Sequence, residues 1–467
     1  MRIKSPIQML CLLLLGCSGC VQVMDFLERT PHPKSNARAE FTQGVTMEQS
    51  GDVAGAIQAY TQAIQIDENL TDAYINRGRV RARAADDRGA IEDDTRAIEL
   101  IRRQAGEYAE RAGRNRPSDD FVESLQEAAQ IARLNRLVAG LYADRGEAKA
   151  RLGDYRGAMS DADRAIELNP ALAEAYVGRG EARNGLGDRQ GAIGEYTQAL
   201  RLDPALAEAH LKRAETKWAL ADYEGAIEDD TAAIRLNPNR AEPYVGRGAA
   251  KEKLGDFPGA IDDATRAIAL EPALAGAYVG RSEAKGKAGD YPGAIDDATR
   301  AIALDPNHAA AYLSRGVARM ATGDYQGTID DATRAIALDP TLADAYVIRG
   351  AVGVQTGDDK GAIGDFTRAI ALKPTLADAY ASRGLAKKRR GDLAGATEDY
   401  TRAITLNPNL ADSRDDLWTA LMVMDDGNAA AVKELSAFIR LGPNAPDVRR
   451  EIDEAKERLK APGQTGP

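Results

Sequence analysis

The sequence predicts an all-α protein built as a solenoid of stacked helix-turn-helix units, and three observations carry that prediction. The block GDYPGAIDDATRAIALDP at residues 289–306 recurs almost unchanged at 255–272 and 323–340, a step of 34 residues. Within each step, apolar residues recur at spacings of three and four, which is the period of an α-helix. Hydrophobic residues make up 44% of the chain but aromatic residues only 5%, so the helices must approach closely through alanine. Units of this kind build arrays by stacking.

The repeat frame extends far beyond the three matching blocks. Twelve units of 34 residues run from Ala37 to Asn444 without any insertion. The units begin at Ala37, Thr71, Ala105, Ala139, Ala173, Ala207, Ala241, Ala275, Ala309, Ala343, Ala377 and Ala411. Below, "position n" counts from the first residue of a unit.

The unit at residues 173–206 shows how each repeat is expected to fold. Two stretches with helical period, 174–186 and 190–202, are separated by Gly187 and Asp188. Asp188 is placed to cap the second helix, because an aspartate before a helix can accept hydrogen bonds from its first N–H groups. Pro204 ends the unit, because proline cannot continue a helix.

These units resemble the tetratricopeptide repeat, whose signature places an aromatic residue, small residues and a proline at fixed positions. In this unit they are Tyr176, Gly180, Ala192, Ala199 and Pro204. The resemblance covers nearly all of the chain that follows the leader. It implies a right-handed superhelical solenoid whose first helices line a concave groove, through which such proteins bind peptides or helices of partner proteins.

The units depart from the family at position seven, where arginine replaces the usual leucine. An acidic residue follows sixteen residues later, at position 23. The pairs are Arg179 and Glu195, Arg247 and Asp263, Arg281 and Asp297, and Arg315 and Asp331. The first unit has Gln43 with Ala59, and the last has Leu417 with Lys433, so both members are lost together. We therefore predict a repeated structural ion pair that fixes the register of the helices.

Two units are irregular. Residues 105–138 lack the glycine and the proline, and either form a degenerate repeat or belong to two over-long helices that project as a hairpin around residues 113–119. The preserved 34-residue phase favours the degenerate repeat. Residues 411–444 are predicted to be a second degenerate repeat, and 445–467 a capping helix (447–459) and tail.

The first residues resemble a bacterial lipoprotein signal peptide. Basic Arg2 and Lys4 precede an apolar run that is too short to cross a bilayer as a helix. The end of that run, Leu14-Leu15-Gly16-Cys17, resembles the motif at which such leaders are cut and the cysteine is lipidated. The resemblance implies a signal peptide at 1–16, lipidation of Cys17 and a tether at 17–36. Ser18 favours the outer membrane.

Other interpretations of the leader remain open. Cys20 is a rival lipid acceptor, but it would place a cysteine where the motif needs an aliphatic residue. The leader could also be an ordinary cleaved signal with incidental cysteines, or the protein a cytoplasmic scaffold.

Composition and motifs argue against several classes of function. The net charge of −11 disfavours binding to nucleic acids, which needs clustered cations. The sequence contains no zinc-binding HExxH, no phosphate-binding GxxxxGK[ST] and no GxSxG. We therefore expect no enzyme activity, no cofactor, no metal and no small-molecule substrate.

The expected function is a non-catalytic protein–protein interaction scaffold, lipid-anchored in the bacterial cell envelope. Positions 2, 5, 9, 12 and 13 of the first helices are implied to line the groove. These include apolar Leu313, Val317, Met320, Val347, Ala351, Val354 and Leu385, and charged Arg79, Arg83, Glu181 and Glu215. Equally, these side chains could pack against the neighbouring unit. An alternative function is recognition of glycan or peptidoglycan-linked peptides, to which the basic run at 387–390 could contribute.

Overall fold

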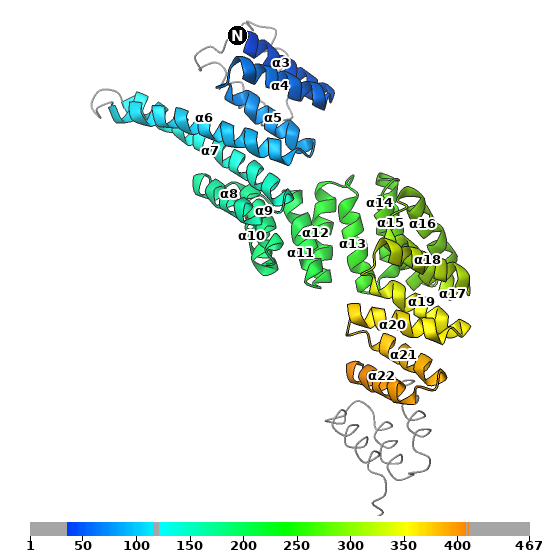
Figure 1. The fold of residues 1–467 in the computed structure, drawn as a ribbon. Helices are drawn as coiled ribbons and strands as arrows, with labels where there is room; N and C mark the ends of the chain where they lie inside the picture. The colour runs from blue at the N-terminus through cyan, green and yellow to red at the C-terminus, as the bar shows by residue number, and fades with distance from the viewer. Residues whose placement is uncertain (1–34, 115–120, 408–409, 411–467) are drawn as a thin grey trace, which may run out of the picture. The chain divides into compact units, whose positions relative to one another are not determined.

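A computed structural model of the chain describes residues 35–114, 121–407 and 410. In these residues every regular element is an α-helix, as predicted (Figure 1). The chain divides into two compact units between Pro238 and Asn239, called here the N-terminal body and the C-terminal body. None of the described helices combines the length and the apolar composition needed to cross a bilayer.

The N-terminal body contains ten described helices. They are α3 (Ser35–Ser50), α4 (Val53–Ile66), α5 (Thr71–Arg83), α6 (Asp87–Arg114), α7 (Phe121–Arg151), α8 (Tyr155–Leu168), α9 (Ala173–Gly185), α10 (Arg189–Leu202), α11 (Ala207–Ala219) and α12 (Tyr223–Leu236). Apart from α6 and α7, each predicted repeat forms one helix pair, and neighbouring pairs pack against each other.

The C-terminal body repeats the same pattern in five helix pairs. They are α13 (Glu242–Lys253) with α14 (Phe257–Leu270), α15 (Ala275–Lys287) with α16 (Tyr291–Leu304), α17 (Ala309–Ala321) with α18 (Tyr325–Leu338), α19 (Ala343–Thr356) with α20 (Asp359–Leu372), and α21 (Ala377–Arg389) with α22 (Leu393–Leu406). The predicted leader, the degenerate unit at 411–444 and the capping helix lie outside the described residues.

The turn inside each repeat has the predicted chemistry. Asp188 caps α10, and its side chain accepts a hydrogen bond of 2.9 Å from the backbone N–H of Gly191. Gly187 has a φ of +89°, a conformation that glycine adopts without steric cost. In two repeats an alanine takes this place, Ala85 at +60° and Ala221 at +61°.

Small residues hold the two helices of a repeat close together. Ala192 and Ala199 are fully buried. A Cβ atom added to Gly180 would lie 2.5 Å from a ring carbon of Tyr196, which is closer than atoms can pack. The alanine-rich composition therefore produces a core by close approach rather than by large side chains.

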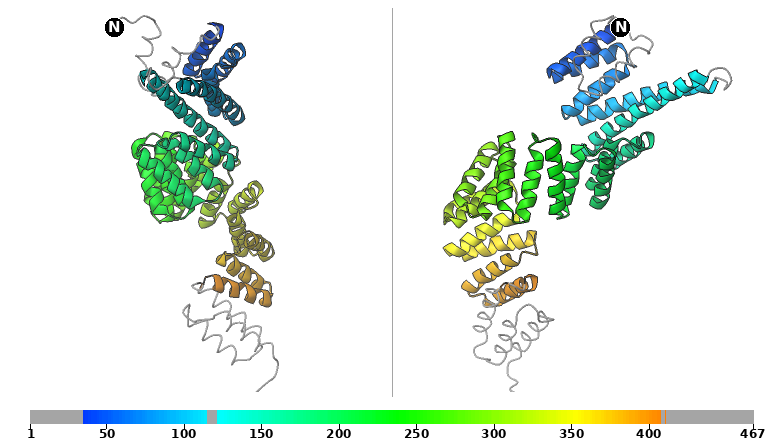
Figure 2. Two further views of the ribbon diagram at one scale, coloured as in Figure 1. Left: turned by 90° about the vertical axis from the view of Figure 1, so that its left-hand side faces the viewer. Right: turned by 180° about the vertical axis from the view of Figure 1, so that it is seen from behind.

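The prediction that residues 105–138 form a separate degenerate repeat is wrong. The structure shows the alternative, in which these residues belong to a hairpin of two long helices. Helix α6 has 28 residues and runs through the start of the predicted unit, and α7 has 31 residues and runs through its end. Figure 2 shows this hairpin extending past its neighbours. Arg102 and Arg136 stand where the following repeats have their terminal proline, so that stop signal is absent from both helices. The missing proline permits the longer helices but does not cause them alone, because α4 ends at Ile66 with Glu68 at the same position.

Candidate interaction surface

The arginine at position seven is bonded to the acidic residue at position 23 in all four predicted pairs. The shortest nitrogen–oxygen distances are 2.8 Å for Arg179–Glu195, 2.6 Å for Arg247–Asp263, 2.7 Å for Arg281–Asp297 and 2.7 Å for Arg315–Asp331. The three aspartates are each bound by Nε and Nη2 together. A bidentate bond of this kind fixes orientation as well as distance.

On most first helices a second cation binds the same carboxylate, and the sequence prediction did not include it. The Nζ atom of Lys285 lies 2.8 Å from Asp297, and Nη1 of Arg319 lies 2.9 Å from Asp331. These cations stand at position 11, one helical turn after the arginine and therefore on the same face. The recurring spacing of four residues was the signal that could have revealed them.

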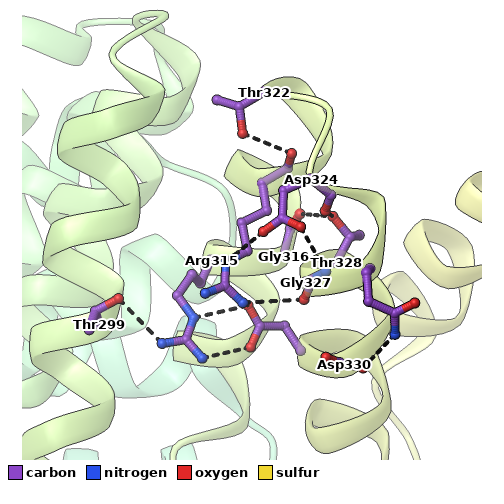
Figure 3. Close-up of polar contacts among 11 residues, drawn as sticks. Thr299, Arg315, Gly316, Thr322, Asp324, Gly327, Thr328 and Asp330 are labelled. Carbon is purple, nitrogen blue, oxygen red and sulfur yellow. Dashed lines mark hydrogen bonds and ion pairs between the residues drawn. The ribbon is translucent and has the colours of Figure 1, made fainter.

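The same arginine also reaches the preceding repeat. Nη1 of Arg315 donates to Oγ1 of Thr299 at 3.3 Å (Figure 3), and Arg281 donates to Thr265 at 3.1 Å. This threonine stands at position 25. We call the recurring set of arginine, carboxylate and preceding threonine the arginine ladder. It binds the two helices of a repeat to each other and, as in Arg281–Thr265 and Arg315–Thr299, links a repeat to the one before.

The bonds of the arginine ladder also join the two repeats on either side of the α6/α7 hairpin. Arg145 binds Asp161 of its own repeat at 2.6 Å and donates to Thr95 at 3.0 Å, although Thr95 lies 50 residues earlier. In a regular junction the equivalent separation is 16 residues. The repeat at Ala139 therefore stacks directly on the repeat at Thr71, and the hairpin is an insertion between them.

Most of the predicted apolar lining is occupied by packing within the C-terminal body. Val354 is 6% exposed, and Val347, Ala351 and Leu385 are half-buried in the same cluster, around Phe366. For these four residues the structure shows packing against neighbouring helices, the alternative left open above. On α17, in contrast, Val317 is 43% exposed, and Leu313 and Met320 are half-buried.

The charged residues of the predicted lining lie in the N-terminal body. Two of them form ion pairs, and the other two are exposed. Arg83 forms an ion pair with Glu48, and Glu181 binds Lys212 at 2.9 Å. Arg79 and Glu215 are exposed. The structure thus brings the lining residues onto the first helices without joining them into one polar cluster.

Among the residues that the structure describes, no three His, Cys, Asp or Glu side chains converge in a way that could hold a metal ion. An open depression of about 600 Å³ lies over α7 and α8. Its acidic residues are already paired: Asp161 with Arg145, Asp163 with Arg179, and Glu167 with Arg164. Nothing in it points to a ligand.

Comparison with known proteins agrees with this geometry. A family model described as tetratricopeptide repeat matches residues 143–207, 185–241 and 279–343, and a second with the same description matches 377–410. No curated protein matches the chain.

Solved structures resemble the chain in part. MamA is 29% identical over 35% of this chain and 96% of its own, with a TM-score of 0.32. A tetratricopeptide repeat protein from Parabacteroides merdae is 17% identical over 53% and 98%, with a TM-score of 0.45. The Cut9 assembly with Hcn1 from the APC/C is 13% identical over 95% and 99%, with a TM-score of 0.46. At these TM-scores the likeness concerns the fold alone.

The helix pairs, their signature residues and the family matches define the class of this protein. It is an all-α solenoid in which residues 143–241, 279–343 and 377–410 match tetratricopeptide repeats, the type of repeat that serves as a scaffold for contacts between proteins.

Proposed function

We propose that this protein is a non-catalytic scaffold of the bacterial cell envelope, exported and anchored by lipid on Cys17, with the outer membrane as its site. In this proposal the first helices of the repeats form the groove that binds a peptide or helix of a partner protein. The leader residues support the location. The exposed first-helix surface of α17 supports the binding mode.

The observation that carries the binding proposal is the contrast between buried charges and exposed apolar atoms. Asp297 and Asp331 are 5% and 3% exposed and are each held by two cations, so they serve stability. Val317 is 43% exposed on a first helix, where burial against a partner removes apolar surface from water. Helix-in-groove recognition uses apolar anchors of this kind.

The glycan-binding alternative has less support, because cations proposed for it are engaged within the protein. Lys387 binds Asp399 at 2.8 Å, and Arg389 donates to the carbonyl oxygen of Val354 at 2.6 Å. Arg83 binds Glu48. Binding of the pure protein to isolated cell-wall sacculi stripped of proteins would nevertheless establish that alternative.

The location is tested with two cysteine variants in the protein's own host. Cys17→Ala is expected to release the protein from the membrane fraction, while Cys20→Ala leaves it there. Intact mass of the native chain should show a lipid-modified Cys17 at the N-terminus. An unprocessed Met1 in the soluble fraction would establish the cytoplasmic alternative instead.

The binding mode is tested by placing a photo-crosslinking amino acid at Val317 and, as a matched control, at Val53. Both valines are 43% exposed, but Val53 begins a second helix, α4, rather than lying on a first helix. A defined partner should be captured at Val317 and not at Val53. Equal capture at both positions would contradict the first helices as the binding face.

A further inference from the structure

One junction in the N-terminal body places two acidic residues against each other. At the junction of the first two repeats, Tyr60 at position 24 accepts a hydrogen bond of 3.4 Å from Asn76, which stands at position six of the next repeat. At the junction that the hairpin interrupts, the same two positions hold Asp94 and Asp144. The remaining described junctions of this body hold Ala162 with Gly178 and Tyr196 with Lys212.

Asp94 is buried without a partner. It is 3% exposed, and no hydrogen bond or ion pair to it occurs within the described part of the chain. Its oxygen Oδ1 lies over α5, because a Cβ added to Gly78 would be 3.0 Å away from it. Burial, and after it the charges of Asp144 and Asp93, raise the pKa of Asp94 to about 8.

The cationic side chains near Asp94 form ion pairs with other aspartates, with one exception. Arg77 and Arg81 bind the adjacent Asp93 at 2.6 and 2.9 Å, and Arg145 binds Asp161. Only the charge of Arg79, which is exposed on α5, acts on both Asp94 and Asp144 and lowers their pKa values. An unpaired buried carboxylate is costly, so a cation supplied from outside would find favourable partners here.

The acidic character continues onto the next first helix. Asp144 on α7 is exposed, but loss of hydration caused by the surrounding protein raises the pKa of its carboxyl. The charges of Glu147 and Glu174 also raise this pKa. Glu147 is paired with Arg151, whereas Glu174 on α9 is exposed and makes no ion pair among the described residues. The unpaired acids thus lie on neighbouring elements and do not converge on one metal ion.

We propose that Asp94 and Asp144 receive a cationic side chain, arginine or lysine, from a basic peptide segment of a partner protein that lies along the first helices α5, α7 and α9. Glu174 would meet a second cation of the same segment. This inference rests on the proposed scaffold function and deepens it by naming the chemistry of the partner. A guanidinium suits the site best, because it binds a carboxylate through two parallel hydrogen bonds.

The test uses the full-length protein and a fluorescein-labelled peptide of twelve residues in which serine and arginine alternate. A second peptide carries citrulline in place of arginine, which keeps the shape and removes the charge. In fluorescence anisotropy the arginine peptide should bind and the citrulline peptide should not. Asp94→Asn should weaken binding by about tenfold, the loss expected for a charge-assisted hydrogen bond.

Two further variants separate this site from general attraction to an acidic protein. Asp230→Asn changes the same position 24 in another repeat, where the residue is 4% exposed, and should leave binding unchanged. Arg79→Gln removes the internal competitor and should strengthen binding. Equal affinity of Asp94→Asn and the unmodified protein would overturn the inference, as would equal losses in Asp94→Asn and Asp230→Asn.

The pH dependence of peptide affinity distinguishes a binding role of Asp94 from a purely structural one. Bound cation favours the ionised form of Asp94, so affinity should rise from about pH 6 to about pH 9 as the proton leaves. The groups that face Asp94 are Asp93 on its own helix, Asp144 and Arg145 on α7, and Arg79 on α5. In Asp94→Asn the rise should be lost. A failure here leaves the Val317 crosslink, in the C-terminal body, as an independent test of the scaffold function.

Discussion

The regular stack of α15–α18 and the long hairpin of α6 and α7 obey the same 34-residue period but fold differently. In the regular stack, Asp305 and Pro306 follow α16 and the chain turns after Leu304. In the hairpin, Ile101 and Arg102 occupy those positions, and α6 continues to Arg114. The comparison teaches that the period sets where helices can pack, whereas local stop signals decide whether a unit becomes a separate pair.

A second lesson is that stacking depends on the flanking repeats and not on the segment between them. Arg145 bonds to Thr95 across the hairpin as Arg281 bonds to Thr265 in the regular stack. The two distances are 3.0 and 3.1 Å. The arginine ladder therefore joins neighbouring repeats in the same way whether or not a hairpin lies between them.

The largest effect is expected from removing the hairpin, which tests whether it is an insertion between two repeats that otherwise stack regularly. Deletion of residues 105–138 alone should fuse α6 and α7 into one helix, so that the first two repeats lose their stacking partner and unfold in a separate transition. The same deletion with a regular turn should restore one cooperative transition. That turn is made by Ile101→Asp, Arg102→Pro, Arg103→Ala and Gln104→Leu.

Thermal unfolding followed by circular dichroism, together with hydrogen exchange of α3–α5, checks both proteins. If the deletion variant without the turn unfolds in one transition, like the deletion variant with the turn, the hairpin is not a simple insertion. The interpretation of the Arg145–Thr95 bond would then be wrong.

Removing the carboxylate of the arginine ladder should be costly where two cations depend on it. Asp161→Ala leaves Arg145 and Lys149 without their partner and should lower the free energy of unfolding by about 2–3 kcal/mol. Asp365→Ala should cost only about 1 kcal/mol, because Asp365 is more exposed and Gly353 stands where the second cation would be. Denaturant unfolding of both variants measures the difference, and equal losses would show that the second cation contributes nothing.

The Asp94 carboxyl makes the hairpin junction sensitive to pH. Its pKa is about 8 in the folded protein against an ordinary value of 3.8, so its contribution is fully present below about pH 4 and is lost as pH rises through 8. Asp94→Asn should therefore match the unmodified protein near pH 4 and exceed its stability near pH 9 by several kcal/mol. Unfolding midpoints across this range test it. A constant difference at every pH would contradict the assignment.

The smallest effects are expected in the turns. Gly323 has a φ of +82°, so Gly323→Ala should destabilise the protein by about 1 kcal/mol. Ala221 already holds such a conformation at +61°, so Ala221→Gly should stabilise it by up to about 1 kcal/mol. Changes in melting temperature of opposite sign would support this, and changes of the same sign would refute it.

The sequence predicted the repeat frame and the arginine pairs well because both depend on local spacing. Asp188 capping α10 follows from one residue next to a break, and Arg281 with Asp297 follows from a constant separation of sixteen. The second cation, Lys285, was missed although its spacing was visible. The packing of Val354 and Leu385 could not be predicted, because exposure on a first helix depends on the side chains that the next repeat presents.

By itself the sequence determined an all-α array of 34-residue repeats, their turns and their buried pairs, because these follow from period, capping and charge within one unit. Only the tertiary structure decided that Thr95 meets Arg145 and that Asp94 stands against Asp144. Residues 50 apart in the chain become neighbours only when the intervening helices extend, and that depends on how two long helices pack against each other. Contacts between repeats are set by stacking, which no single unit encodes.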